Sequence, residues 1–170
     1  WPRGRFMMIA LANEDGSFTL TLFMPHEHHE FAFDKLNTKA DVDRFFRTIF
    51  PDFHDLMPDI ADKWDDHPLS NLAIIRCYPW AAGKVGLMGD AAHATVPFYG
   101  QGMNAGFEDC RVLNELMLKH NHDWDAIWAE YSPLRKPNGD ALQDLSLDNY
   151  IEMRDLVADP SFLLRKKIEG

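Results

Sequence analysis

The stretch GLMGDAAHATVPFYGQGMNAGFED, residues 86–109, decides the fold of this chain. An apolar run, VGLMGD, ends at Asp90, and a loop with Pro97, Gly100 and Gly102 follows it. The run is expected to be a short buried strand that delivers Asp90 at its carboxyl end, where ligand clefts of open sheets form. From Gly102 onward the apolar residues recur with helical period. A strand, a glycine-rich loop and a helix start in such close succession predict a ligand site.

The residue types suggest the kind of ligand. A carboxylate at Asp90 can accept hydrogen bonds from two hydroxyl groups, as a sugar or sugar alcohol offers them. Glycines at 100 and 102 let the backbone approach a flat ligand without Cβ clashes. The first N–H groups of the helix carry partial positive charge, which suits an electron-rich atom. The alternative is that Asp90 caps a turn and that the glycines serve tight geometry alone.

Composition excludes several other classes of protein. The 170 residues suffice for one ordinary domain, and 46% hydrophobic and 12% aromatic content argues against disorder. A net charge of -10 offers no basic surface for nucleic acid. Two cysteines, Cys77 and Cys110, fit a reducing, cytoplasmic setting. No apolar run approaches the roughly 20 residues of a membrane span. Because the chain opens at Trp1 and enters an apolar run at once, we expect a piece of a longer protein.

Local patterns predict an α+β fold, with mostly strands in the first half and helices in the second. RFMMIALANEDGSFTLTLFMP reads as a β-hairpin that turns at Asp15 and Gly16, with alternate residues of its second strand on opposite faces. An amphipathic helix follows, with Asn37 or Thr38 as its cap and Pro51 as its end. The expected later elements are a strand over 72–80, a helix from Gly102 with Phe107, Val112, Leu113, Leu116 and Met117 inward, and two helices over 123–135 and 139–157.

The opening stretch closely resembles the second flavin-binding motif of the FAD-dependent aromatic-ring hydroxylases, which are single-component monooxygenases. The elements of that motif present here are Gly89, Asp90, Pro97, Gly100, Gly102 and Asn104. FMMIALAN, FTLTLFMP, PFYGQGMNAGFEDC and DLSLDNYIEMR narrow the resemblance to members of the family that hydroxylate L-kynurenine. These segments are spread over nearly the whole chain.

The resemblance implies that this α+β chain is part of an α/β FAD-binding hydroxylase fold. An antiparallel substrate-domain sheet with one helix would occupy residues 1–80. The second FAD-binding motif, a strand, loop and helix, would occupy 81–120, and a C-terminal helical segment 121–170.

The same resemblance assigns residues to the cofactor and to the substrate. By similarity, Asp90 holds the ribitol of FAD, and Met103 and Asn104 contact the flavin beside the Gly100 and Gly102 loop. Asn149 matches an asparagine that helps hold the substrate carboxylate. The other implied substrate-pocket residues are Ile9, Leu11, Thr21 and Phe23 on the sheet, and Pro97, Phe98 and Met153 near the flavin. Ordinary core packing is the alternative for the apolar members of this set.

The implied reaction uses NADPH and O2. NADPH reduces FAD, a flavin C4a-hydroperoxide forms, and one hydroxyl passes to the ring of L-kynurenine, giving 3-hydroxykynurenine. The cofactor carries the chemistry, so no side chain is assigned a catalytic role. His93, inside the motif, is expected to be a hydrogen-bonded scaffold residue rather than a proton carrier. Two alternatives stay open: a related hydroxylase of another aromatic acid, and a non-catalytic module that keeps the scaffold.

Three expected features of such an enzyme are missing from the 170 residues. The first is the G-x-G-x-x-G fingerprint that binds the FAD pyrophosphate. The second is the upstream arginine and tyrosine for the substrate carboxylate, and the third is a later C-terminal tyrosine. We therefore expect an N-terminal part of the same protein as partner, an inactive isolated fragment, and a membrane anchor on the parent if it is eukaryotic. HEHHEFAFD is not H-E-x-x-H, and no metal site is predicted.

Overall fold

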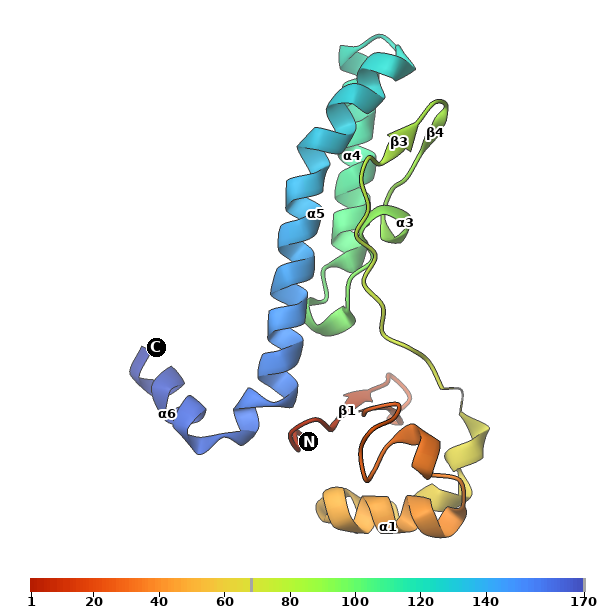
Figure 1. The fold of residues 1–170 in the computed structure, drawn as a ribbon, viewed down its shortest axis with the longest axis vertical. Coiled ribbons are helices and arrows are strands. Elements are labelled where there is room, and N and C mark those ends of the chain that lie inside the picture. Colours follow the sequence, from red (N-terminus) through yellow and green to blue (C-terminus); the bar gives the residue numbers. More distant parts are fainter. Residues whose placement is uncertain (68, 170) are drawn as a thin grey trace. The chain divides into compact units, whose positions relative to one another are not determined.

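The computed structural model describes residues 1–67 and 69–169, and it divides into two compact units (Figure 1). One unit comprises Trp1–Ser70 with Ile151–Gly170, and the other comprises Asn71–Tyr150. The chain is mostly helical, with two small antiparallel sheets of two strands each among the described residues. No described helix combines the length and the apolar character that crossing a membrane requires.

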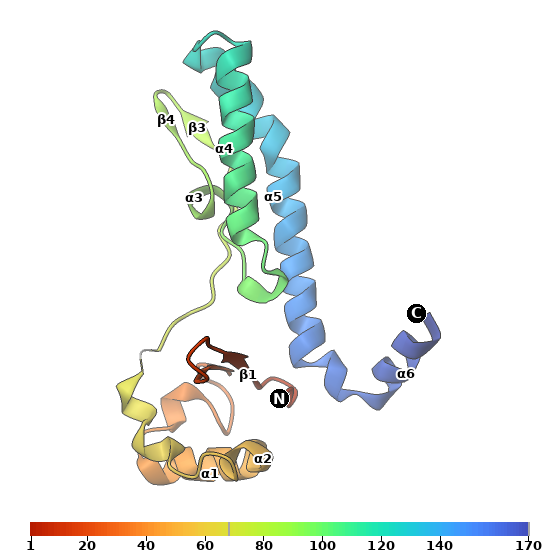
Figure 2. The ribbon, with the colours of Figure 1, turned by 180° about the vertical axis from the view of Figure 1, so that it is seen from behind.

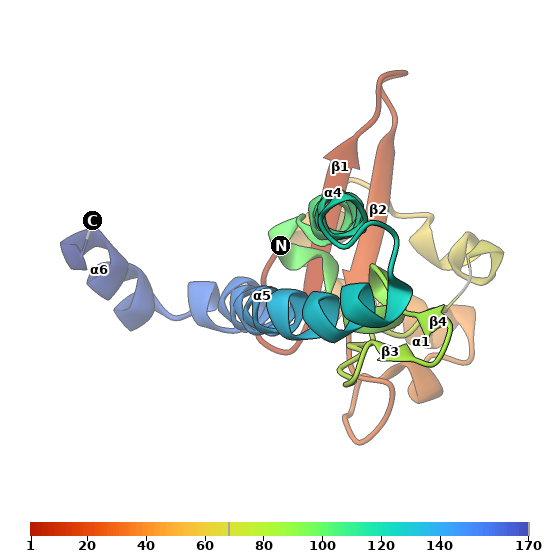
Figure 3. The ribbon, with the colours of Figure 1, turned by 90° about the horizontal axis from the view of Figure 1, so that it is seen from above.

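The first unit opens with the predicted β-hairpin. Strand β1, Met7–Ala12, pairs antiparallel with β2, Phe18–Phe23, and Figure 3 shows the two strands side by side. The turn between them uses Gly16 at φ +82°, a conformation that glycine adopts without strain. The hairpin prediction is therefore confirmed, including the need for a positive φ in its turn.

Helix α1, Lys39–Ile49, follows and is capped as its sequence predicts. Of the two candidate caps the structure uses Thr38, whose Oγ1 accepts a hydrogen bond from Asp41 N while the Asp41 side chain accepts one from Thr38 N. Pro51 ends α1 and also opens α2, Pro51–His54, at a position where its missing N–H costs nothing. The remaining helices of this unit are η1 Phe33–Lys35, η2 Ile60–Asp62, η3 Trp64–Asp66, η5 Leu156–Ala158 and α6 Pro160–Glu169.

An aromatic core holds the first unit together. Phe45, Phe46 and Phe50 are at most 2% exposed and contact one another with ring centroids 5.0 to 6.1 Å apart. Met8 of the hairpin belongs to the same cluster. Met8 therefore determines which face of the hairpin packs on this core, and Ile9 and Leu11 lie on the other face.

The second unit is built on two long helices. Helix α4, Gly102–Lys119, and helix α5, Trp124–Arg154, run side by side in Figures 1 and 2. Helix α5 belongs to this unit as far as Tyr150. Beside them lie β3 Ala81–Ala82, β4 Val85–Gly86, α3 Asp90–His93 and η4 Pro97–Tyr99. The buried residues between these elements include Trp80, Val112, Leu116, Ile127 and Tyr131. Val112 and Leu116 lie inward as predicted, whereas Phe107 is 65% exposed, contrary to the prediction.

The prediction of two helices over 123–135 and 139–157 is wrong, because α5 is one continuous helix that contains Pro133 and Pro137. Each proline removes one N–H from the helix, which favours a break. One buried stripe nevertheless continues through both prolines: Ile127, Tyr131, Arg135, Gly139, Gln143 and Ser146. Packing of that stripe outweighs the local cost of the prolines.

Two strand predictions also need correction. Residues 72–80 form no strand, and the VGLMGD strand is reduced to Val85–Gly86, with Val85 66% exposed. A strand needs a neighbour, and among the described residues β4 pairs only with β3. The segment before β3 is held by a side chain instead: Gln143 Nε2 donates to the carbonyls of Ile75 at 2.6 Å and Ala94 at 2.8 Å.

Candidate functional site

Asp90 lies on a sharp turn at the start of α3. Gly89 precedes it at φ +55° and ψ −138°, a conformation that L side chains rarely adopt. The Gly89 carbonyl accepts hydrogen bonds from Ala92 N and His93 N, both at 2.9 Å. Asp90 itself is exposed, and its carboxylate accepts no hydrogen bond from residues 1–67 or 69–169. Its lone pairs are therefore available to a ligand.

The start of α4 is similarly open. Gly100 adopts the left-handed conformation, φ +65°, which glycine enters without strain. No described side chain caps the N-terminus of α4. Asn104 is exposed and its Nδ2 donates to Gln101 Oε1 at 2.7 Å, while Met103 is 71% exposed. The first N–H groups of this helix thus offer partial positive charge to a ligand.

A buried carboxylate links the Asp90 turn to helix α4. Asp109 of α4 is fully buried, and its Oδ2 accepts a hydrogen bond from Gly89 N at 2.9 Å. The same oxygen lies 2.6 Å from Nε2 of His93, at the end of α3. The other oxygen, Oδ1, accepts from Nε of Arg135 on α5 at 2.8 Å. His93 therefore has the hydrogen-bonded scaffold position expected of it.

The charge of Asp109 is maintained by these partners. Burial alone disfavours the ionised carboxylate, but hydrogen bonds from His93, Gly89 N and Arg135 outweigh burial and hold its pKa below the ordinary value. Burial, and then the neighbouring Asp109 charge, raise the pKa of the Tyr131 phenol. Asp109 is consequently an anion, and Tyr131 is neutral, at physiological pH.

Asn149 contacts the loop that carries two predicted substrate residues. Its Nδ2 donates to the carbonyl oxygen of Phe98, in the short helix that begins at Pro97. The Tyr150 ring stacks on the Phe98 ring, with centroids 4.4 Å apart and planes 20° apart. Met153 follows Asn149 one turn later on α5 and is half-buried. The structure therefore brings Asn149, Pro97 and Phe98 together.

The hairpin gathers the other four predicted substrate residues on one face. Directly opposed residues of antiparallel strands share a face, and Ile9 is opposite Thr21. Leu11 and Phe23, two residues away on each strand, point the same way. Met8 and Leu22, on the other face, pack against the aromatic core. The face with the four residues is left partly open, and Leu11 is 61% exposed.

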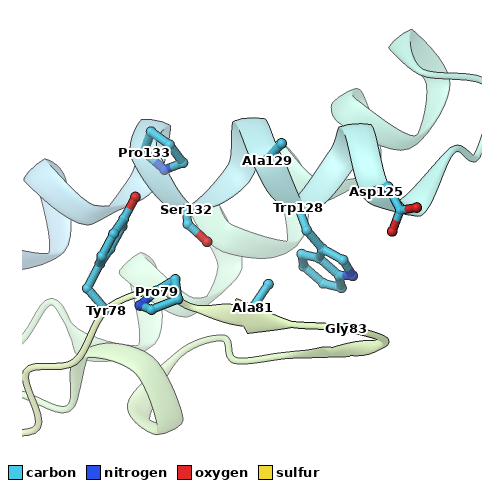
Figure 4. A pocket seen from close by; sticks show the side chains of 9 residues that line it. All are labelled: Tyr78, Pro79, Ala81, Gly83, Asp125, Trp128, Ala129, Ser132 and Pro133. Atoms are coloured by element: carbon cyan, nitrogen blue, oxygen red, sulfur yellow. The ribbon is translucent and has the colours of Figure 1, made fainter.

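A cavity of about 300 Å³ lies elsewhere in the second unit, between α5 and the β3–β4 hairpin (Figure 4). Its walls include Tyr78, Pro79, Trp128, Ser132 and Pro133, and none of the residues predicted to bind a ligand lines it. Ser132 Oγ is buried and has no hydrogen-bond partner within the described part of the chain. No described group of three or more His, Cys, Asp and Glu residues is arranged to hold a metal ion.

Sequence reasoning missed Asp109, Arg135 and Tyr150. A signal for Asp109 was present, because it precedes Val112 and Leu116 at helical spacing and so lies on the apolar stripe of α4. Arg135 lies on the buried stripe of α5, four residues after Tyr131. The helix predicted over 123–135 contains this part of the stripe, and the expected break concealed only its continuation through Gly139, Gln143 and Ser146.

Comparison with known proteins gives concordant results. A family model described as FAD binding domain matches residues 25–146. Kynurenine 3-monooxygenase of Cytophaga hutchinsonii is 55% identical over 170 residues, which is 99% of this chain and 38% of that protein. The enzymes of the same name from Flavobacterium johnsoniae and Dictyostelium discoideum are 52% and 46% identical, with 99% of this chain covered and 38% and 39% of theirs. The chain thus spans less than half the length of these relatives.

A solved structure supports the fold. The tetracycline destructase Tet(51) superposes with a TM-score of 0.62 over 96% of this chain and 44% of its own chain. Sequence identity is only 19%, so the likeness concerns the fold alone.

Proposed function

Because this chain belongs to the FAD binding domain family and is homologous over 99% of its length to kynurenine 3-monooxygenases, we propose that it is part of a flavoprotein hydroxylase of L-kynurenine. The proposed product is 3-hydroxykynurenine, and the proposed co-substrates are NADPH and O2. The observation that carries the proposal is the open Asp90 turn beside the uncapped start of α4. That geometry agrees with the family that the sequence comparison indicates.

The residues around the Asp90 turn fit FAD. An exposed carboxylate without a partner in the described chain suits the hydroxyl groups of a ribitol. The start of α4, with Gly100, Gly102, Met103 and Asn104, suits the electron-rich edge of a flavin ring, since a helix N-terminus stabilises negative charge. When bound, FAD supplies the transfer of electrons from NADPH and the activation of O2.

In the proposed enzyme this chain binds and orients the substrate. By the family resemblance, Asn149 would donate to the carboxylate of kynurenine. The resemblance also assigns Ile9, Leu11, Thr21 and Phe23, on one face of the hairpin, to the substrate. Pro97, Phe98 and Met153 would close the pocket and exclude water. Accordingly, residues 1–80 would form the substrate-binding part, 81–120 the flavin-binding part and 121–170 the C-terminal helical part.

The proposal is tested on the full-length protein that contains this chain. NADPH oxidation and 3-hydroxykynurenine formation are measured with added FAD and L-kynurenine. Product formed in step with NADPH use supports the proposal. A protein that retains FAD but leaves kynurenine unchanged overturns the substrate and favours another aromatic acid. A protein that takes up no FAD overturns the flavin assignment and favours a non-catalytic module.

The Asp90 assignment is tested separately. Asp90→Ala in the full-length protein is expected to weaken FAD binding while the fold stays intact, because the lost carboxylate is exposed and accepts no hydrogen bond in the described chain. The matched control is Asp125→Ala, since Asp125 is also an exposed aspartate in the first turn of a helix. FAD affinity equal to wild type in Asp90→Ala would contradict the assignment.

A further inference from the structure

We propose that His93, Asp109 and Arg135 are positioning residues for the cofactor: they lock the Asp90 turn and the start of α4 into one geometry. This inference rests on the proposed FAD site. None of the three side chains is itself exposed at that site, since His93 is 3%, Asp109 0% and Arg135 5% exposed. They act through the backbone of Gly89 and through the placement of α4.

The Gly89 peptide is held by hydrogen bonds at both its N–H and its carbonyl. Its N–H donates to Asp109 Oδ2 at 2.9 Å, and its carbonyl accepts two N–H groups of α3. Gly89 is thus held on both sides in a conformation that only glycine adopts without strain. The direction in which Asp90 leaves the turn is determined by these bonds. A change at Asp109 therefore alters the aim of the Asp90 carboxylate.

The Gly89 turn is also coupled to α4 through Asp109. Asp109 lies seven residues after Gly102 on α4, about 10 Å along the helix axis. A Cβ on Gly106 would lie 4.0 Å from Gly89 Cα, so the turn and the helix are in van der Waals reach of each other. The Asp109 carboxylate thereby sets the distance between the Asp90 turn and the start of α4.

The orientation of the Asp109 carboxylate is fixed as well. Its two oxygens have different partners, with Gly89 and His93 on Oδ2 and Arg135 on Oδ1. Arg135 also donates from Nη2 to the Ala105 carbonyl of α4 at 3.4 Å. A carboxylate with partners at both oxygens cannot rotate without losing hydrogen bonds.

Stability alone is a poor reason for this arrangement. A buried ion pair often contributes no more to folding than well-packed apolar side chains of similar volume. The surroundings are well suited to apolar packing, since the Trp80 ring lies 5.1 Å from the His93 ring and Gly139 leaves room for both. A polar network in such a place is better explained by the direction that its hydrogen bonds impose.

The experiment compares His93→Phe and His93→Gln in the full-length protein. Phenylalanine keeps the ring volume but cannot donate to Asp109, whereas the glutamine amide can donate again. The matched control is His54→Phe, because His54 is 5% exposed and its Nε2 lies 2.9 Å from Asp43, in the other unit. The readouts are the FAD dissociation constant and the amide exchange of a peptide that covers residues 87–94 in the FAD-free protein.

We expect His93→Phe to weaken FAD binding about tenfold, as loss of an outer hydrogen-bond partner does at metal sites. It should also speed exchange of the 87–94 amides, and His93→Gln should restore both properties. His54→Phe should lower the melting temperature without changing either readout. A His93→Phe protein that binds FAD as the wild type does, or a glutamine variant that restores nothing, overturns the inference.

Two further outcomes are separated by design. If the wild-type protein binds no FAD, the proposed function fails. If Asp90→Ala weakens FAD binding but His93→Phe does not, only the positioning role is overturned. If His93→Phe does not fold, Arg135→Lys replaces it. Lysine keeps the charge but loses the planar geometry of the guanidinium. Weaker FAD binding by Arg135→Lys without faster exchange of the 87–94 amides would then overturn the inference.

Discussion

The Asp109 carboxylate and the His93 ring lie 2.6 Å apart, and neither residue is more than 3% exposed. Sixteen positions separate them in sequence, and they belong to different helices. Asp109 is a charged group in the interior of the second unit, and it is hydrogen-bonded to Gly89, the residue before Asp90. Its consequences for pH dependence and for packing are measurable.

Replacing Asp109 is expected to destabilise the protein strongly at neutral pH and less in acid. Asp109→Asn leaves the buried Arg135 charge without its partner, which costs about 3–5 kcal/mol. Because the pKa of Asp109 lies below its ordinary value of 3.8, the wild-type carboxylate contributes its full stability above that pH and loses it as the pH falls further. Urea unfolding at pH 7 and at pH 3 measures the free energy of unfolding for both proteins.

The difference between wild type and Asp109→Asn should therefore shrink at pH 3. Other acidic groups titrate equally in both proteins and cancel in that difference. Asp125→Asn, at an exposed position, should change the free energy of unfolding by less than about 0.5 kcal/mol at either pH. An equal loss for Asp109→Asn at both pH values would show that its charge contributes nothing to folding.

Gly139→Ala is expected to destabilise the second unit by about 1–3 kcal/mol. The added Cβ would lie 3.0 Å from Trp80 Cη2 and 3.2 Å from His93 Cβ, closer than carbon atoms normally approach. Gly106→Ala is the matched control, since both glycines lie within helices and a Cβ at 106 meets only ordinary contact at 4.0 Å. That variant should be neutral or stabilising, because alanine favours helix. Thermal unfolding distinguishes the two, and equal melting temperatures would contradict the packing argument.

If Asn149 holds the substrate carboxylate as proposed, Asn149→Ala is expected to raise the KM for L-kynurenine in the full-length protein about tenfold, because that hydrogen-bond donor is lost. The decarboxylated analogue of kynurenine should lose nothing by the same substitution. Steady-state kinetics with both compounds tests this.

A separate variant accounts for the structural contact of Asn149. Its amide also donates to the Phe98 carbonyl, so Asn149→Ala removes a hydrogen bond of that loop as well. Tyr150→Leu removes the ring stacked on Phe98 and keeps the Asn149 amide. If Asn149→Ala impairs both compounds as strongly as Tyr150→Leu does, the role of Asn149 is to hold the loop rather than the carboxylate.

The local elements of this protein were predictable because their signals are local. The hairpin follows from alternating residues around Asp15 and Gly16, and the cap of α1 from Thr38 and Asp41, three residues apart. The family, too, was recognisable from the stretch around Asp90. Turn angles and caps depend on neighbouring residues, so a short segment contains the whole of the relevant information.

Only the tertiary structure decided the rest. Pro133 and Pro137 predict a break, yet α5 continues because its buried stripe packs in the second unit on both sides of the prolines, from Ile127 to Ser146. The VGLMGD strand is short because a strand extends only as far as a neighbour pairs with it, and β3 pairs with two of its residues. The segment's own sequence does not reveal the length of its partner. Asp109 became the centre of a network only when α3, α4 and α5 brought His93 and Arg135 to it from distant positions. Sequence alone determined turns, caps and the family, whereas burial and pairing, which depend on contacts between distant residues, determined helix continuity and the network beneath Asp90.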